Sequence, residues 1–246
     1  MDRMLYVAMS GASQTMLAQA ATTNNLANAS TTGFRADFEQ FRAMPVFGEG
    51  YGSRVYSMTE RPRTDFSGGA LHTTGRELDM AINGEGWFAV RTAEGGEAYT
   101  RAGDLRVTPN GQLVNGAGHV MLGDGGPLVI PPYDKLDIGD DGTITIVPLG
   151  QGPENLAVVG RVKLVNPDLA QLEKGLDGLM HLPEGEVAQA DAGVRLINGA
   201  VEASNVNAVQ EIVSMLELAR HYEMQIKMMK TAEETDQASA QLLRNM

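Results

Sequence analysis

Glycine and proline are distributed very unevenly along this chain. All ten prolines, and every one of the 29 glycines except Gly11, lie between Gly33 and Gly199. The segment from Ala200 to Met246 contains neither residue. Because glycine and proline are the strongest breakers of regular structure, this distribution predicts a turn-rich centre between two helical ends.

The composition limits the classes of partner. With 246 residues, 43% of them hydrophobic, the chain can form a sizeable core. The formal net charge of −12 argues against a nucleic-acid partner, because binding to phosphates needs a basic surface. No apolar run approaches the roughly 20 residues of a membrane span, so we expect no direct insertion into a membrane. The absence of cysteine excludes disulfides and thiolate metal ligands.

The first residues also lack the marks of a cleavable signal peptide. The longest apolar run there, Met4–Met9, follows Asp2 instead of a basic segment, and no convincing cleavage site is present. If the protein leaves the cytoplasm, we expect it to do so without such a signal.

A first helix is expected from Arg3 to about Asn28, where mostly small residues recur at steps of three and four. This narrow stripe predicts close packing against something else. Gly33 follows the helix and can adopt the left-handed turn that ends such a segment. The candidate assembly residues on this helix are Leu5, Ala8, Ala12, Met16, Ala20 and Ala27.

A second helix is expected to begin near 204–207, where N-cap residue types gather, and to extend for about 40 residues. It carries two apolar stripes. The first contains Val209, Ile212, Leu216, Ala219 and Ile226, and the second contains Met215, Leu218, Tyr222, Met229 and Ala232. One stripe of about 100° is enough for one core, so two stripes indicate more than one neighbour. The alternative is that the helix runs through the middle of its own domain. The candidate assembly residues here are Val209, Ile212, Leu216, Ala219, Tyr222, Ile226 and Met229.

Short alternating runs separated by turn residues fill the centre. Hairpins are expected around 94–96, 109–111 and 140–142, and a late apolar strand over 158–165. Strands at this spacing predict a compact antiparallel β domain. The predicted fold class is therefore α+β, with terminal helices flanking a central antiparallel β domain.

The sequence offers no catalytic or metal-binding pattern of useful specificity. The segment Gly84–Ala89 fits a relaxed dinucleotide fingerprint, but a strand follows it where that motif needs a helix. The four histidines are dispersed, with no metal-binding spacing. We therefore expect no enzymatic activity, no cofactor and no metal. Two alternatives stay open: a cell-wall hydrolase whose site assembles from distant residues, and a scaffold or adhesin that binds a ligand through the β domain.

Two further segments stand out near the ends of the central region, 24–35 and 200–209, and three lie within it, 78–88, 99–103 and 122–131. Together they resemble the bacterial flagellar rod and hook proteins. The central segments 78–88, 99–103 and 122–131 follow the order of that family. The segments 1–12 and 217–229 resemble its proximal-rod members. The matching positions of the N-terminal signature are Asn24, Asn25, Asn28, Thr32, Gly33 and Phe34, and those of the C-terminal signature are Ser204, Asn205, Val206 and Asn207.

The resemblance implies a structural subunit of the flagellar basal-body rod, which crosses the periplasm. Its N- and C-terminal helices pair in a coiled-coil-like manner, and the β domain lies outside them. Implied partners are copies of the chain, other proximal and distal rod proteins and the flagellar export apparatus. A distal rod or hook-type protein is the alternative. The corresponding divisions are 1–35 for the first helix and its turn, 36–75 for an extended, partly β segment, 76–199 for the β domain and 200–246 for the long helix.

Overall fold

The structure is a computed structural model that describes residues 4–38, 41–45, 55–59, 63–152, 154–183 and 186–244. Helices lie near both ends of the chain and antiparallel strands between them, which confirms the α+β class. In these residues no helix combines the length and apolar character needed to cross a membrane. The chain forms two compact units: one comprises Met1–Ala29, Ala36–Asp65 and Val206–Met246, the other Ser30–Arg35 and Phe66–Asn205.

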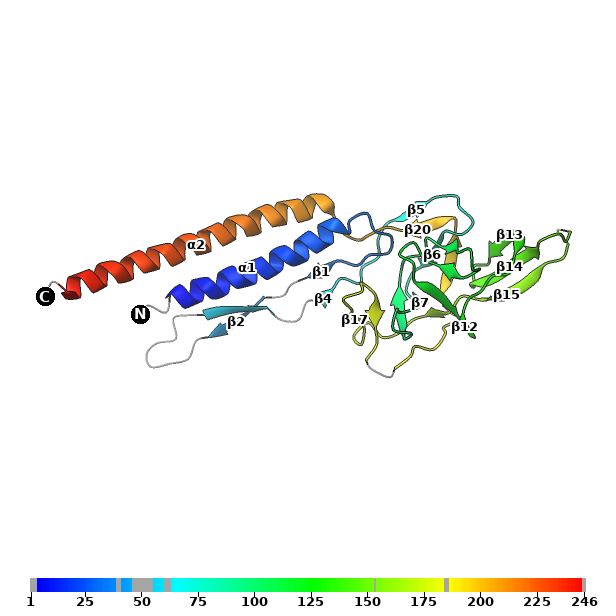
Figure 1. The fold of residues 1–246 in the computed structure, drawn as a ribbon, viewed down its shortest axis with the longest axis horizontal. Helices are drawn as coiled ribbons and strands as arrows, with labels where there is room; N and C mark the ends of the chain where they lie inside the picture. Colours follow the sequence, from blue (N-terminus) through cyan, green and yellow to red (C-terminus); the bar gives the residue numbers. More distant parts are fainter. Residues whose placement is uncertain are drawn as a thin grey trace. The chain divides into compact units, whose positions relative to one another are not determined.

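The first unit is built around two antiparallel helices, α1 (Met4–Ala27) and α2 (Ala208–Arg244), which lie side by side (Figure 1). Asn207 caps α2, because its Oδ1 accepts hydrogen bonds from the N–H groups two and three residues further on, at 3.1 and 3.3 Å. The side chain of Gln225 lies against Gly11. The Nδ2 of Asn25 donates to Oε1 of Glu211 at 3.4 Å. Both contacts share one register, since the spacing from Gly11 to Asn25 equals that from Glu211 to Gln225.

Two β-ribbons complete the first unit. Strand β1 (Asp37–Phe38) pairs with β4 (Arg63–Thr64), and β2 (Phe41–Pro45) pairs with β3 (Val55–Thr59), both antiparallel. The hydroxyl of Ser10 donates to the carbonyl of Ser57 at 3.3 Å. Helix α1 therefore has α2 along one side and the β2–β3 ribbon along another (Figure 1).

The second unit contains a nine-stranded sheet of order β17-β18-β8-β7-β11-β10-β9, in which β12 also pairs with β11 and β16 with β7. Its strands are β7 (Trp87–Arg91), β8 (Glu97–Thr100), β9 (Arg106–Val107), β10 (Leu113–Val114), β11 (Val120–Gly123), β12 (Gly126–Pro127), β16 (Leu164–Val165), β17 (Glu173–Lys174) and β18 (Met180–His181).

Smaller sheets surround this one in the second unit. They are formed by β5 (Leu71–Thr73) with β20 (Ala200–Glu202), by β6 (Met80–Asn83) with β19 (Arg195–Asn198), and by β13 (Tyr133–Ile138), β14 (Thr143–Pro148) and β15 (Ala157–Arg161). Every pairing is antiparallel.

The three expected hairpins are confirmed as β7–β8, β9–β10 and β13–β14. Gly111 and Gly142 occupy turns with φ of 78° and 86°, a region that favours glycine. The single late strand expected over 158–165 is wrong, because β15 pairs with β14 whereas β16 pairs with β7. Between them, buried Val162 donates its N–H to the carbonyl of Gly142 at 2.8 Å. The chain thus changes sheet at a buried apolar residue, which hydrophobic periodicity cannot distinguish from a continuing strand.

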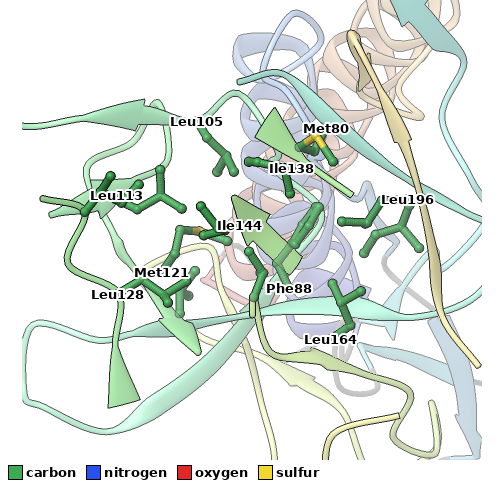
Figure 2. Close-up of a cluster of buried hydrophobic side chains, with 14 of the residues drawn as sticks. Met80, Phe88, Leu105, Leu113, Met121, Leu128, Ile138, Ile144, Leu164 and Leu196 are labelled. Atoms are coloured by element: carbon green, nitrogen blue, oxygen red, sulfur yellow. The ribbon is translucent and has the colours of Figure 1, made fainter. Parts of the chain in front are cut away.

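The second unit has its own hydrophobic core (Figure 2). Phe88, Leu105, Leu113, Ile138 and Ile144 are completely buried in it. Each such side chain contributes roughly 1.5–3 kcal/mol on burial. Among the described residues of the first unit, by contrast, every buried apolar side chain belongs to alanine: Ala8, Ala12, Ala18, Ala36 and Ala232. The second unit is therefore well supplied with buried apolar area and the first is not.

Candidate functional site

One face of α2 packs on α1 and carries the second predicted stripe. Met215, Leu218, Tyr222 and Met229 are half-buried along it, and Ala232 is buried. The buried residues of α1 include Ala8, Ala12 and Ala18. At Gly11 an added Cβ would lie 2.9 Å from Nε2 of Gln225, so the absence of a side chain there permits a close approach of the two helices.

The first predicted stripe of α2 remains exposed. Val209 is 72% exposed and Leu216 is 55% exposed, with Ile212 and Ile226 also in the exposed class. Ala219, at the edge of this stripe, is half-buried. On α1, Leu5, Met16, Ala20 and Ala27 are exposed. The candidate assembly residues thus fall into a set that joins α1 to α2 and a larger set that faces away from both.

The larger, exposed set of assembly residues is unusual because of where its large side chains lie. Large apolar residues are exposed on both helices, whereas the fully buried residues of the helices are small or polar. Exposed apolar surface of this kind marks an interaction site. The exposed faces of the helix pair are therefore the candidate site for association. Within the ranges that the structure describes, no three His, Asp or Glu side chains are placed to hold a metal ion.

The N-terminal signature contains a clamp formed by Asn25, which is buried. Its Oδ1 accepts the N–H of Asp37 at 2.9 Å, and its Nδ2 donates to the carbonyl of Asp37 at 2.9 Å. The amide therefore binds the following segment as a neighbouring strand would. Asn28 donates to the carbonyl of Asn24 at 3.0 Å and so closes the end of the helix.

Gly33 is required by both its conformation and its surroundings. Its φ is 67°, and an added Cβ would lie 2.3 Å from the carbonyl carbon of Arg101. Its N–H donates to the carbonyl of Glu202 at 2.8 Å. Nothing larger than glycine fits this close approach of two backbones.

Phe34 and Asn205 bring the two signatures together. The N–H of Asn205 donates to the carbonyl of Phe34 at 3.4 Å, and its Nδ2 donates to the carbonyl of Ser67 at 3.2 Å. The Nζ of Lys174 lies 3.9 Å from the centroid of the Phe34 ring, in a cation–π contact. The remaining signature residues Thr32, Ser204 and Val206 are half-buried.

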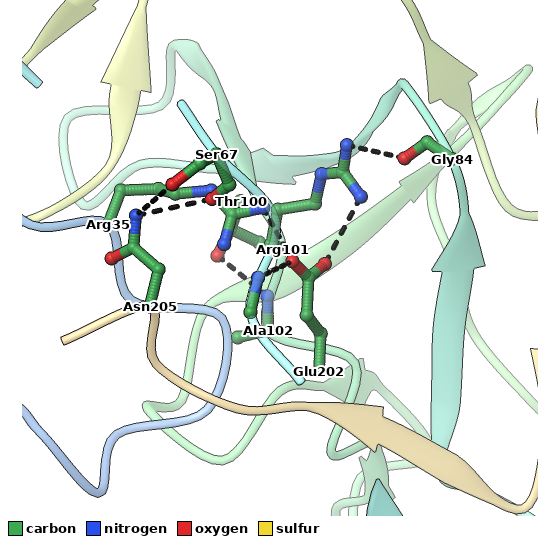
Figure 3. A network of polar contacts seen from close by, with 9 residues as sticks. Arg35, Ser67, Gly84, Thr100, Arg101, Ala102, Glu202 and Asn205 are labelled. Carbon is green, nitrogen blue, oxygen red and sulfur yellow. Dashed lines mark hydrogen bonds and ion pairs between the residues drawn. The ribbon is translucent and has the colours of Figure 1, made fainter. Parts of the chain in front are cut away.

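A buried ionic network links the same segments (Figure 3). Arg35 lies 2.6 Å from Oε1 of Glu202, and Arg101 lies 3.1 Å from Oε2. The N–H of Gly69 also donates to Oε1, at 2.8 Å. Both guanidinium groups lie over the ring of Trp87, at 5.7 and 5.3 Å from its centroid. Burial lowers the pKa of Arg101, and the carboxylate of Glu202 opposes that effect.

Sequence reasoning missed Arg35, Arg101 and Glu202 as functional residues. A signal was nevertheless present, since Arg35 and Glu202 are single charges of opposite sign within two otherwise uncharged signatures. Their pairing anchors the N-terminal and C-terminal signatures to one point of the β domain.

Comparison with known proteins agrees with this arrangement. Three family models match: "Flagella basal body rod protein" at residues 5–35, "Flagellar hook protein FlgE/F/G D1 domain" at 81–146, and "Flagellar basal body rod FlgEFG protein C-terminal" at 197–242. The chain is 40% identical to the flagellar basal-body rod protein FlgF of Salmonella typhimurium and 41% identical to that of Escherichia coli, in both cases over 99% of each chain. It is 30% identical to the flagellar basal-body rod protein FlgG of Buchnera aphidicola, over 97% of this chain and 98% of the relative.

Proposed function

Because this chain belongs to the family of flagellar basal-body rod proteins FlgF, we propose that it assembles into the proximal rod through the exposed faces of α1 and α2. Membership of the family makes it a structural subunit of the basal-body rod. A distal rod or hook-type protein, a cell-wall hydrolase and an adhesin are not favoured by these relationships.

The observation that carries the proposal is the contrast within the first unit between buried alanines and exposed large residues. Met16, Val209 and Leu216 are each more than half exposed. Association that covers such side chains contributes about 25 cal/mol per Å² of apolar area removed from water. Neighbouring rod subunits, whether copies of this chain or other rod proteins, would supply that cover.

In this proposal the role of the protein is mechanical. Subunits held by their helices form a shaft across the periplasm and pass torque to one another without chemistry. The network around Glu202 supports this role, because it fastens both signature segments to the folded β domain. We further propose that the flagellar export apparatus delivers the chain to the rod.

Charged substitutions on the exposed stripe test the proposal. Leu216→Asp and Ile226→Asp place an unpaired charge in the expected contact, so neither variant should enter basal bodies or restore swimming to a strain that lacks its own protein. Leu176→Asp is the matched control, because Leu176 is fully exposed in the β17–β18 turn of the second unit. Fluorescence of Trp87 reports whether that unit stays folded. Normal incorporation and swimming of both helix variants would refute the proposal.

A further inference from the structure

Four asparagine–glycine pairs occur in the second unit: Asn83–Gly84, Asn110–Gly111, Asn115–Gly116 and Asn198–Gly199. Asparagine is a thermolabile residue. The nitrogen of a following glycine can attack its side-chain amide carbon, which releases ammonia and closes a cyclic imide that water opens to aspartate or isoaspartate. This reaction is favoured where the side-chain amide and the glycine N–H are not hydrogen-bonded and where the space beside the glycine is open.

The pair Asn83–Gly84 meets all of these conditions. Strand β6 ends at Asn83, which is exposed. Among the residues that the structure describes, neither the side-chain amide of Asn83 nor the N–H of Gly84 has a hydrogen-bond partner. Gly84 has a φ of 90°, and an added Cβ there would meet no atom within 4 Å. Ring closure at this pair therefore breaks no hydrogen bond and collides with no neighbour.

The turn around Asn110 and Gly111 is closed to the same reaction, although Asn110 is exposed. The N–H of Gly111 donates to the carbonyl of Thr108 at 2.8 Å. An added Cβ at Gly111 would lie 2.7 Å from the carbonyl oxygen of Ile130. The attacking nitrogen is thus engaged and the space beside it is occupied.

The other two pairs have engaged side-chain amides. Asn115 is buried, and its Oδ1 accepts the N–H of His119 at 2.8 Å. The Nδ2 of Asn198 donates to the carbonyl of Ile138 at 2.6 Å. Each side chain must lose a hydrogen bond before its amide carbon can turn toward the following nitrogen, so both reactions should be slow.

Positive charge lies beside the reactive pair. The Nη2 of Arg101 donates to the carbonyl of Gly84 at 2.8 Å (Figure 3). This cation favours the anionic nitrogen that forms when Gly84 loses its amide proton. Arg195 lies opposite Asn83 in the pairing of β19 with β6, so a carboxylate formed at position 83 gains a cross-strand partner of opposite charge.

We propose that Asn83 is a site of spontaneous conversion to aspartate and isoaspartate. The Gly84 nitrogen gives its proton to water and bonds to Cγ of Asn83, while the bond from Cγ to Nδ2 breaks and Nδ2 leaves as ammonia. Water then supplies the oxygen of the new carboxylate. The site is independent of the proposed function, because it depends only on the geometry of the second unit.

The isoaspartate product has a structural consequence. It inserts one methylene group into the main chain directly before Gly84, and so displaces the carbonyl that Arg101 holds. Arg101 also binds Glu202, which carries the network between the two signature segments. We therefore expect isoaspartate at position 83 to weaken that network, whereas aspartate, which keeps the normal main chain, should leave it intact.

Peptide mapping of the purified full-length chain tests the site. The folded protein is incubated in mildly alkaline buffer and digested, and the conversion of amide to acid is followed by mass spectrometry. Isoaspartate is identified by methyl transfer from S-adenosylmethionine with an isoaspartyl methyltransferase. Asn83 should react about tenfold faster than the asparagine of any other pair, which is the factor that one retained hydrogen bond gives.

The unfolded chain is the control for sequence effects. In urea the protecting contacts are lost, so all four pairs should react at similar rates. Equal rates in the folded protein, or faster reaction at another pair, would overturn the assignment. An unchanged preference for Asn83 in urea would also overturn it, because the preference would then come from the sequence alone.

Variants test the residue and its consequence. Asn83→Gln lengthens the side chain and should abolish the fast reaction, whereas the matched Asn110→Gln should retain it. Aged protein that contains isoaspartate should unfold at a lower urea concentration by Trp87 fluorescence, and fresh Asn83→Asp protein should unfold like the original chain. Persistence of the fast reaction in Asn83→Gln would assign it to another residue, and unchanged stability of the aged protein would exclude the effect on the network.

Discussion

The guanidinium group of Arg35 lies 2.6 Å from the carboxylate of Glu202, although 167 residues separate them in the chain. Both side chains are almost completely buried, and Arg101 approaches the second carboxylate oxygen. A single carboxylate therefore balances two cations at the point where both signature segments meet the β domain. Removing the carboxylate leaves two buried guanidinium groups without their counter-ion.

Glu202→Ala should lower the free energy of unfolding of the second unit by about 3–5 kcal/mol, because breaking a buried ion pair strands its partners. Urea unfolding followed by the fluorescence of Trp87, the single tryptophan, measures the change. Glu77→Ala is the control, since Glu77 is exposed, and it should change stability by less than about 0.5 kcal/mol. Equal losses in the two variants would contradict a role for the network.

Gly33→Ala and Gly75→Ala separate backbone strain from crowding. Both glycines have positive φ, of 67° and 73°. An added Cβ at Gly75 meets no atom within 4 Å, so this variant should lose only the roughly 1–2 kcal/mol of a left-handed conformation. At Gly33 the Cβ would collide with the peptide after Arg101, and we expect a clearly larger loss. Denaturant midpoints compare the two, and a loss at Gly33 no greater than at Gly75 would argue against the close approach.

Asn25→Ala should free the segment that follows α1. The variant removes both hydrogen bonds between the side chain and the backbone of Asp37, each worth about 0.5–1.5 kcal/mol. Amide hydrogen exchange at Asp37 should therefore become about tenfold faster, since 1.4 kcal/mol corresponds to a factor of ten. Asn24→Ala, at an exposed neighbour, should leave this exchange rate unchanged. Unaltered exchange in Asn25→Ala would exclude the clamp.

Tyr99 should make the protein sensitive to alkali. Burial raises the pKa of its phenol from 10.0 to about 12, while a hydrogen bond from the N–H of Ala188 opposes the shift. The neutral phenol is thus favoured in the folded state, so its contribution is complete below pH 10 and is lost as the pH rises through about 12. The loss amounts to roughly 2–3 kcal/mol.

Phenolate absorbance during an alkaline titration measures this effect. One of the six tyrosines should ionise near pH 12, in step with unfolding. Tyr99→Phe should lack that step. A titration in which Tyr99→Phe retains the late ionisation would assign it to another residue.

Local signals explain the parts of the fold that the sequence predicts correctly. The N-cap at Asn207 and the turn glycines Gly111 and Gly142 depend on interactions with residues nearby in the chain. The sequence alone therefore predicts them. The ionic network is different, because Arg35, Arg101 and Glu202 are far apart in the chain and contact one another and Trp87 only in the folded β domain. The passage at Val162 from one sheet to another likewise depends on tertiary pairing and has no local mark.

Alanine is the only apolar residue type that is fully buried in the described part of the first unit, so little buried apolar area stabilises this unit in the free chain. Ala8, Ala12 and Ala18 are the buried apolar residues of α1, and each removes little apolar area from water. We expect the first unit of a free chain to be less rigid than the second, whose core contains many large buried side chains. If other rod subunits cover the exposed side chains of α1 and α2, as we propose, the first unit would become rigid on assembly.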